Sequence, residues 1–204
     1  MTTRTLLIGA TALAIALQAC ASRKPAPPPP PTVSVSSSRT EGGGMAEETV
    51  TVTATVQSID HQTRMVTLLG PDGDTRRVHV SDDVKNLDQV KKGDLVTLVL
   101  YEAIAYQVRK KGTTEPGIAE AADVATAPYG ARPGMAGASA VTITATIVSV
   151  DRHTNTVKLK GPEGNVVSVK VSDPTRLEGV AVGDLVEITY TEAVAVAVTP
   201  APKS

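Results

Sequence analysis

The sequence predicts an all-β protein with two tandem small closed β-barrels, each with a short helix, on disordered tethers. Apolar and polar residues alternate with a period of two over several segments, which is the pattern of strands with one buried face. Turn sequences rich in Gly, Pro and Asp separate these segments. A stretch of about 60 residues occurs twice along the chain, which indicates a duplicated structural unit.

The first twenty residues have the features of an export signal. Arg4 supplies a positive charge, and the apolar run 6–17 that follows is too short to span a bilayer comfortably. The run closes in "LQAC", with the small residue Ala19 before Cys20. This pattern resembles the signal of bacterial lipoproteins, so we expect residues 1–19 to be a signal peptide and Cys20 to be the lipidated first residue of the mature chain. An ordinary secretory signal with an incidental cysteine is the alternative.

The same resemblance implies an address in the cell envelope. A lipidated Cys20 would anchor the chain in a membrane, and several acyl groups are needed because one chain alone binds only marginally. Ala21 after the cysteine, rather than Asp, favours the periplasmic side of the outer membrane of a Gram-negative cell. Cys20 is the sole cysteine, so packing without an internal disulfide must hold the fold together.

Three segments are predicted to lie outside the barrels. Residues 20–48 read as a tether, because "PAPPPPP" favours polyproline II and "SSSRTEGGG" is flexible. Residues 109–140 are rich in Gly, Pro, Ala and Thr and read as a flexible linker. Within it, "IAEAADVA" (118–125) predicts at most a helical turn or two, too short to be stable alone. Residues 199–204 are a tail.

The internal repeat defines the two barrels. The segment "TVTATVQSIDHQTRMVTLLGPDGDTRRVHVSDD" from Thr51 aligns with "TITATIVSVDRHTNTVKLKGPEGNVVSVKVSDP" from Thr142. After a gap of one residue, "LDQVKKGDLVTLVLYEAIAYQV" aligns with "LEGVAVGDLVEITYTEAVAVAV". We therefore assign the first barrel to residues 49–108 and the second to residues 141–198.

Each copy predicts the same order of elements. The first strand, 49–59 or 140–150, alternates apolar residues with Thr, which suits a pleated surface. The turns "DHQT" and "GPDG", or "DRHT" and "GPEG", lead to a second and a third strand. "SDDV" or "SDPT" then begins a short helix, and a Gly-Asp turn enters a long final strand. These elements fit an OB-like barrel, because an open sheet of this size would leave edges and apolar surface uncovered.

The final strands carry a carboxylate on their apolar stripe. Glu102 in "YEAIAYQV" and Glu192 in "YTEAVAVAV" share the parity of the inward residues. One interpretation is a bulge or bend at Glu-Ala, which would close the barrel and expose the carboxylate. The other is a carboxylate at the barrel mouth that contacts a cationic or hydroxylated ligand. The bend is favoured, because both copies keep this Glu while the histidines differ between them.

The histidines do not form a metal-binding pattern. His61, His79 and His153 occupy positions that are not equivalent in the two copies, and no Cys/His spacing typical of zinc sites occurs in the sequence. Nucleic acid is also excluded as a partner, because the net charge is −1 and the chain has no Phe or Trp for base stacking. We therefore predict neither a metal nor a cofactor.

The sequence does not predict an enzyme. It has no nucleophile elbow and no Gly-rich phosphate loop. Four aspartates recur in both copies, Asp60 and Asp151 at strand ends, Asp94 and Asp184 after Gly in turns. We expect their carboxylates to accept hydrogen bonds from turn amides, a structural role.

A motif in each copy resembles a known class of exported proteins. "V-x-x-I-D-x-x-x-x-x-V-T-L", followed by "V-x-x-G-D-x-V", is similar to the small periplasmic copper/silver-binding barrels of metal efflux systems. It is more similar still to exported small-barrel domains without an assigned activity. The metal-binding barrels use a His, two Met and a Trp around the middle strands. Here "TRRVHVS" and "VVSVKVS" contain neither Met nor Trp, and Met65 aligns with Thr156, so we assign no metal ligand.

These observations predict a membrane-anchored, periplasm-facing lipoprotein that acts as a non-enzymatic binding or spacer module of the cell envelope. Its partners would be the membrane, through Cys20, and an envelope protein or the cell wall. Two copies would suit bivalent binding, in which the second weak contact gains from effective concentration. The resemblance implies the alternative, a binder of copper, silver or a small ligand.

Overall fold

The computed structural model describes residues 28–40 and 42–201, which form one antiparallel sheet of ten strands. The strands are β1 (Thr32–Thr40), β2 (Gly43–Asp60), β3 (Met65–Leu69), β4 (Thr75–His79), β5 (Leu95–Arg109), β6 (Gly117–Thr126), β7 (Gly134–Asp151), β8 (Thr156–Lys160), β9 (Val166–Lys170) and β10 (Leu185–Thr199). The expected short helices are not confirmed, because only single 3-10 turns, η1 (Leu87–Gln89) and η2 (Pro174–Leu177), lie near their positions. The prediction of an all-β fold is confirmed.

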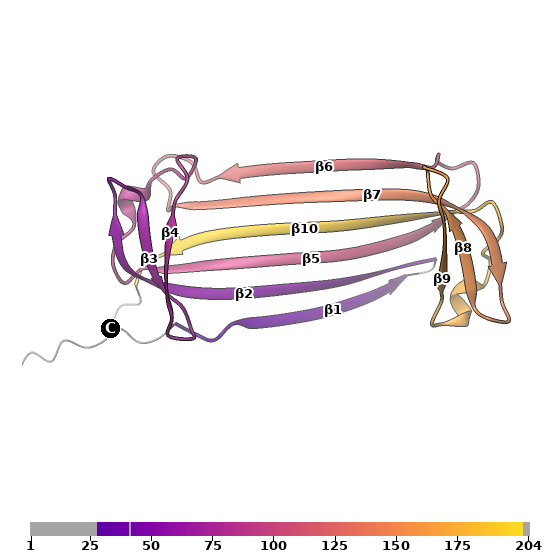
Figure 1. Cartoon of the computed structure of the whole chain (residues 1–204), viewed down its shortest axis with the longest axis horizontal. Helices are drawn as coiled ribbons and strands as arrows, with labels where there is room; N and C mark the ends of the chain where they lie inside the picture. The colour runs from indigo at the N-terminus through magenta and orange to yellow at the C-terminus, as the bar shows by residue number, and fades with distance from the viewer. Residues whose placement is uncertain (1–27, 41, 202–204) are drawn as a thin grey trace, which may run out of the picture.

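The two tandem barrels are not observed, because the two copies share one open sheet. β5 lies between β2 and β10, and β10 lies between β5 and β7. Both edges of each final strand are therefore paired with long neighbours, and neither strand can close a barrel with β4 or β9. The six long strands run side by side in the order β1-β2-β5-β10-β7-β6 (Figure 1).

The sheet is symmetrical about the two glutamates of the final strands. β5 and β10 pair over their full lengths, and Glu102 lies directly opposite Glu192 at the centre. The register continues equally on both sides, with Leu98 opposite Val196 and Tyr106 opposite Ile188. The repeat therefore corresponds to an approximate twofold axis through the Glu102–Glu192 pair.

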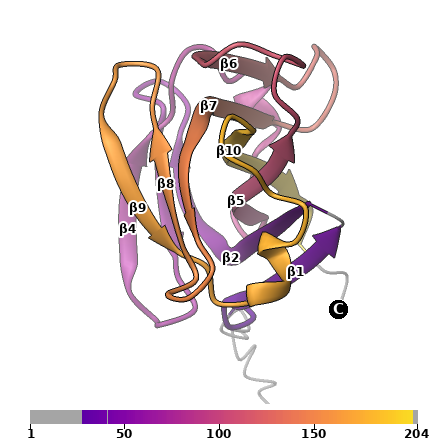
Figure 2. The same ribbon diagram turned by 90° about the vertical axis from the view of Figure 1, so that its right-hand side faces the viewer.

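A hairpin extends the sheet at each end of the long strands. β3 and β4 follow β2 and, with η1, form what we call the first cap. β8 and β9 follow β7 and, with η2, form the second cap. Both caps rise on the same face of the sheet (Figures 1 and 2).

The bend that shapes each cap lies in β2 and β7. The β2–β3 register shifts between Val56 and Ser58, and the β7–β8 register shifts between Ile147 and Ser149, as at β-bulges. Pairing passes through Glu102 and Glu192 without a shift. The interpretation of these glutamates as the bend of the final strand is therefore wrong.

Each cap has its own apolar core, and each core contains side chains from both copies. The first core is formed by Val56, Val66, Leu87, Val90 and Val198. The second is formed by Ala145, Ile147, Val157, Leu159, Leu177, Val180 and Val186. Val198, at the end of the second copy, thus lies in the core of the first cap. Tyr106 and Val108, at the end of the first copy, pack against the core of the second. The two copies are intertwined rather than tandem.

The segments expected to be a tether and a linker contribute strands. β1 and the start of β2 lie within 20–48, and β6 and the start of β7 lie within 109–140. β1 pairs with β2, and β6 with β7, so they extend the sheet at both sides. Residues 118–125 are therefore in a strand and not in a helical turn, because β7 offers them a complete hydrogen-bonding edge.

The signal peptide 1–19 and the lipidation site Cys20 lie outside the described residues. Within residues 28–40 and 42–201, the structure has no helix long and apolar enough to cross a membrane.

Candidate binding trough and cavity

An open apolar floor lies between the two caps, and we call it the trough. Val35, Ile104 and Val194 leave 73%, 52% and 45% of their surface exposed there. The other exposed apolar residues of this floor are Val33, Leu100, Ile118, Val124, Met135, Ile143 and Tyr190. Six strands at about 4.8 Å spacing make the floor about 24 Å wide. Contiguous apolar surfaces larger than a few hundred Å² mark interaction sites in soluble proteins.

A row of carboxylates crosses the middle of the trough. Glu102 faces Glu192 on one side and Glu48 on the other, so all three lie on the apolar face. None of the ion pairs among the described residues includes them. Like charges in directly opposite positions destabilise a sheet. This row therefore favours a cationic group above the centre of the trough.

Tyr190 contacts this row as a hydrogen-bond donor. Its hydroxyl donates a hydrogen bond of 2.7 Å to Glu192 Oε1. This hydrogen bond, followed by burial and the negative charges of Glu102 and Glu192, raises the pKa of Tyr190 to about 12. The phenol therefore stays protonated and neutral at physiological pH.

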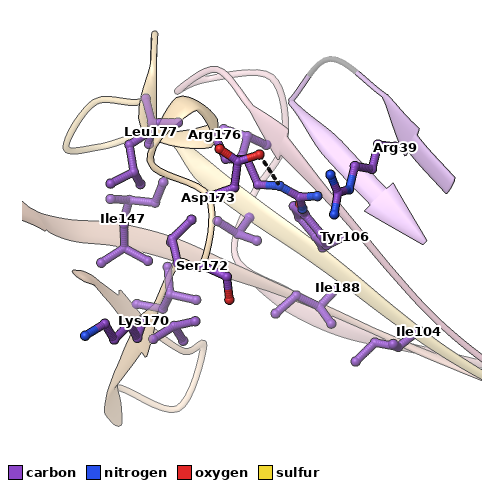
Figure 3. A pocket seen from close by; sticks show the side chains of 17 residues that line it. Arg39, Ile104, Tyr106, Ile147, Lys170, Ser172, Asp173, Arg176, Leu177 and Ile188 are labelled. Carbon is purple, nitrogen blue, oxygen red and sulfur yellow. Dashed lines mark ion pairs between the residues drawn. The ribbon is translucent and has the colours of Figure 1, made fainter. Parts of the chain in front are cut away.

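A cavity of about 490 Å³ lies under the second cap and reaches the trough (Figure 3). Apolar side chains form its walls. They include Ile104, Tyr106, Val108, Ile147, Val157, Leu159, Val169, Val171, Leu177, Val180, Val186 and Ile188. Ile104 belongs to both the cavity and the trough, so the two features are continuous.

Charged side chains gather at the edge of this cavity. Arg39 comes from β1, Lys170 from the end of β9, and Arg176 from η2. Arg176 lies 5.6 Å from the centre of the Tyr106 ring, and its Nε is 3.9 Å from Asp173 Oδ2. Arg39 takes part in no ion pair among the described residues.

One carboxylate oxygen of Asp173 already accepts hydrogen bonds at the N-terminus of η2. Its Oδ1 accepts hydrogen bonds from the Thr175 hydroxyl at 2.6 Å and the Thr175 backbone N–H at 3.1 Å. These bonds hold the pKa of Asp173 below its usual value. Arg39 and Arg176 lie on the same side of the cavity as this one carboxylate, and Lys170 points away from them, so the edge near the arginines is net positive (Figure 3).

The first cap differs at the equivalent positions. Asn86 stands where the second cap has Arg176, and Val194 and Val196 stand where it has Ile104 and Tyr106. The loop 127–133 also packs against this cap. Its Pro128 carbonyl accepts a hydrogen bond of 2.8 Å from Asn86 Nδ2, and its Gly130 N–H donates one of 3.1 Å to Asn86 Oδ1. The residues that line the cavity at the second cap are thus not repeated at the first.

Asp60 and Asp151 have the structural role expected from the sequence. Asp60 Oδ1 accepts the N–H of Gln62 at 2.9 Å, and Asp151 Oδ1 accepts the N–H of His153 at 2.9 Å. Hydrogen bonds from the turns, chiefly those of Thr63 and Thr154, hold the pKa of both carboxyls below the usual range.

Asp94 and Asp184 anchor the Gly-Asp turns from buried positions, with 5% and 3% of their surface exposed. Asp184 Oδ2 accepts hydrogen bonds from Lys110 Nζ at 2.9 Å and the Ala181 N–H at 3.1 Å. Asp94 Oδ2 accepts the corresponding bonds from Arg132 Nη1 at 3.3 Å and the Lys91 N–H at 3.1 Å. Each aspartate thus ties its turn to a segment distant in the sequence.

We expect Asp184→Asn to lower the free energy of unfolding by about 1.5–3 kcal/mol at pH 7, because a buried charge-assisted hydrogen bond is lost. Lys110 holds the pKa of Asp184 below its usual value. The contribution is therefore present above the unfolded pKa of about 3.9 and is lost as the pH falls through the lower folded pKa. Urea unfolding at pH 7 and near pH 3 should show a difference that shrinks in acid.

Glu187→Gln is the matched control, since it removes only the more exposed pair with Arg109, where the separation is 3.5 Å. This variant should change stability by less than about 1 kcal/mol. Equal losses for the two variants, or a loss for Asp184→Asn that is independent of pH, would contradict this role.

The structure places the predicted functional residues unequally. It brings Glu102 and Glu192 together and places Glu48 in the same row. Glu48 could have been found from the sequence, because it has the same parity as Val50 and therefore lies on the same face of its strand. Arg39 gave no signal, because it lies in a segment that reads as tether. Among the histidines, His79 lies opposite Met65 in the β3–β4 pair. No group of three or more His, Cys, Asp or Glu that could hold a metal occurs within the described part of the chain.

Comparisons of the chain with protein-family models, with curated proteins and with solved structures find no match. The trough and the cavity are therefore the features that indicate a function.

Proposed function

We propose that this chain is a membrane-anchored, periplasm-facing lipoprotein and a non-enzymatic binding module of the cell envelope. Its binding surface would be the trough. The observation that carries the proposal is an exposed apolar floor crossed by three carboxylates, Glu48, Glu102 and Glu192, that form no ion pair among the described residues. The proposal of a lipid anchor at Cys20 and of a location in the cell envelope rests on the N-terminal sequence.

The composition of the trough favours a protein partner with an apolar surface and basic side chains. A partner would cover the apolar floor, and its Lys or Arg residues would relieve the repulsion within the acidic row. A second copy placed face to face on the same axis would bring two acidic rows together. A different envelope protein is therefore favoured over self-association, and over the polar cell wall.

A binding role also fits the chemistry of the floor. Its polar groups include carboxylates, the Tyr190 hydroxyl, which donates to Glu192, and the Ser37 and Ser139 hydroxyls. Among the described residues neither serine forms a hydrogen bond with a carboxylate that could activate it, so we propose no catalytic step.

Site-specific cross-linking in cells tests this proposal. A photoreactive amino acid at Leu100, or at the equivalent Tyr190, lies on the trough and should capture an envelope protein. The same group at Thr51 or Thr142, equivalent positions on the opposite face, should capture nothing in common with it. Capture should be identified by mass spectrometry.

The acidic row provides the second arm of the test. The double variant Glu102→Gln, Glu192→Gln should reduce capture at Leu100 at least several-fold, because the partner's cations lose their counter-charges. The proposal would be wrong if the trough captured no envelope component, or if both faces captured the same ones.

Soft-metal binding remains the alternative prediction. Its one structural support is the Met65–His79 pair, which offers a thioether and an imidazole on adjacent strands. The second copy has Thr156 opposite Lys170 at these positions, so the pair is not duplicated.

A further inference from the structure

The cavity of the second cap has the interior of a site for a long apolar group. Ile147, Leu159 and Leu177, each at most 4% exposed, form part of its wall. Its volume of about 490 Å³ falls within the range of about 300–1,000 Å³ typical of small-molecule sites. A polar or hydrated ligand would lose its hydrogen bonds to water against these walls without replacing them.

The edge of the same cavity has the opposite character. The guanidinium groups of Arg39 and Arg176 come from separate elements, β1 and η2, and lie near the Tyr106 ring (Figure 3). Guanidinium groups bind carboxylate and phosphate oxygens in a bidentate manner. Asp173 is 3.9 Å from Arg176 Nε and also interacts with the charge of Arg39, so one negative charge faces two positive charges and one positive charge is left over.

We propose that this cavity binds an acyl chain with an anionic head group, with the chain among the apolar walls and the head group between Arg39 and Arg176. The shared chemistry is that of a fatty carboxylate and of an acylated phosphate such as a lysophospholipid. The site is independent of the protein partner proposed for the trough, although Ile104 borders both.

Titration calorimetry on the mature chain from residue 20, carrying Cys20→Ser so that it has no acyl groups of its own, tests the proposal. Dodecanoate and dodecyl phosphate, each below its micelle concentration, should bind at one site per chain. Dodecanol and dodecylamine should bind at least tenfold more weakly. A further titration with lysophosphatidylglycerol, compared with that of dodecanoate, distinguishes a phospholipid from a free fatty acid as the ligand.

Two pairs of variants locate the site. Arg39→Gln alone should weaken the binding of dodecanoate. The double variant Arg39→Gln, Arg176→Gln should weaken it at least tenfold. Arg76→Gln with Arg77→Gln, on the first cap, should leave it unchanged. Ile104→Trp should block the cavity, whereas Val194→Trp, at the equivalent position on the other side of the twofold axis, should not. Thermal unfolding shows whether each variant is folded. If the double variant does not fold, the single Arg39→Gln variant, whose substitution lies on an exposed edge strand, still tests the binding of the head group.

The proposal is overturned if the neutral and cationic amphiphiles bind as tightly as the anionic ones, if both Trp variants behave alike, or if no probe binds. Leu100 and Tyr190 do not line the cavity, so the cross-linking result for the trough stands or fails separately.

Discussion

A chain that ends after the first copy, residues 20–112, is expected not to fold as a stable monomer. Val198, which completes the core of the first cap, would be missing. The whole of β5, 15 residues long, would lose its partner β10 and expose an unpaired edge. Two separate barrels would instead predict that this fragment folds independently.

The geometry also predicts that the fragment can cover the unpaired edge of β5 by forming a dimer. Two fragments can pair through their β5 strands about the same twofold axis, with Glu102 opposite Glu102. Light scattering and circular dichroism should therefore show either an unfolded chain or a dimer, the dimer being weakened at neutral pH by the facing carboxylates.

Mixing this fragment with residues 113–204 provides the control. The mixture should form a one-to-one complex with a cooperative unfolding transition, because together the fragments hold every strand of the sheet. A monomeric fragment 20–112 with its own cooperative transition would contradict the intertwined arrangement.

Ile147→Ala should be among the most destabilising single substitutions in the chain. Ile147 is 1% exposed and lies in the second-cap core, so its truncation leaves a cavity that the surrounding strands cannot fill. We expect the free energy of unfolding to fall by about 2–5 kcal/mol in urea denaturation.

The repeat supplies the control for this substitution. Val56 occupies the equivalent position of the first cap, where it is also 1% exposed. Ile147→Val therefore makes the second cap like the first and should cost only about 0.5–1.5 kcal/mol. Similar losses for Val and Ala at position 147 would show that the core relaxes around this position.

The local elements of each copy could be predicted from the sequence because their signals are local. Alternation in 51–59 and 142–150 sets the strands, and "GPDG" and "GPEG" set the hairpins between the short strands. What was not predicted is which strands pair. An alternating stripe shows that a strand has a buried face, but it does not specify the neighbour on either edge.

The length of the final strands was the signal that could have revealed the pairing. The stripe of β5 continues past Glu102 to Tyr106 and Val108, farther than one small barrel requires. The structure explains this length, because the start of β5 serves the first cap and its end serves the second. Glu102 lies between the two, where the floor is open.

The outer strands β1 and β6 were missed for a different reason. "TVSVSSSRT" and "GIAEAADVAT" each contain only two large apolar residues, and composition favours a tether or a linker. They form strands because β2 and β7 present complete unpaired edges to them. Val33, Val35, Ile118 and Val124 then extend the apolar floor, and Arg39 reaches the cavity.

The position of Val198 in β10 has a consequence for the order of folding. Because the first cap, built mainly from residues 56–96, needs this residue, its core cannot be completed until β10 has been synthesised. Pairings between residues so distant in sequence form slowly. An arrangement of this kind delays the final collapse of the first cap until both copies of the repeat are available.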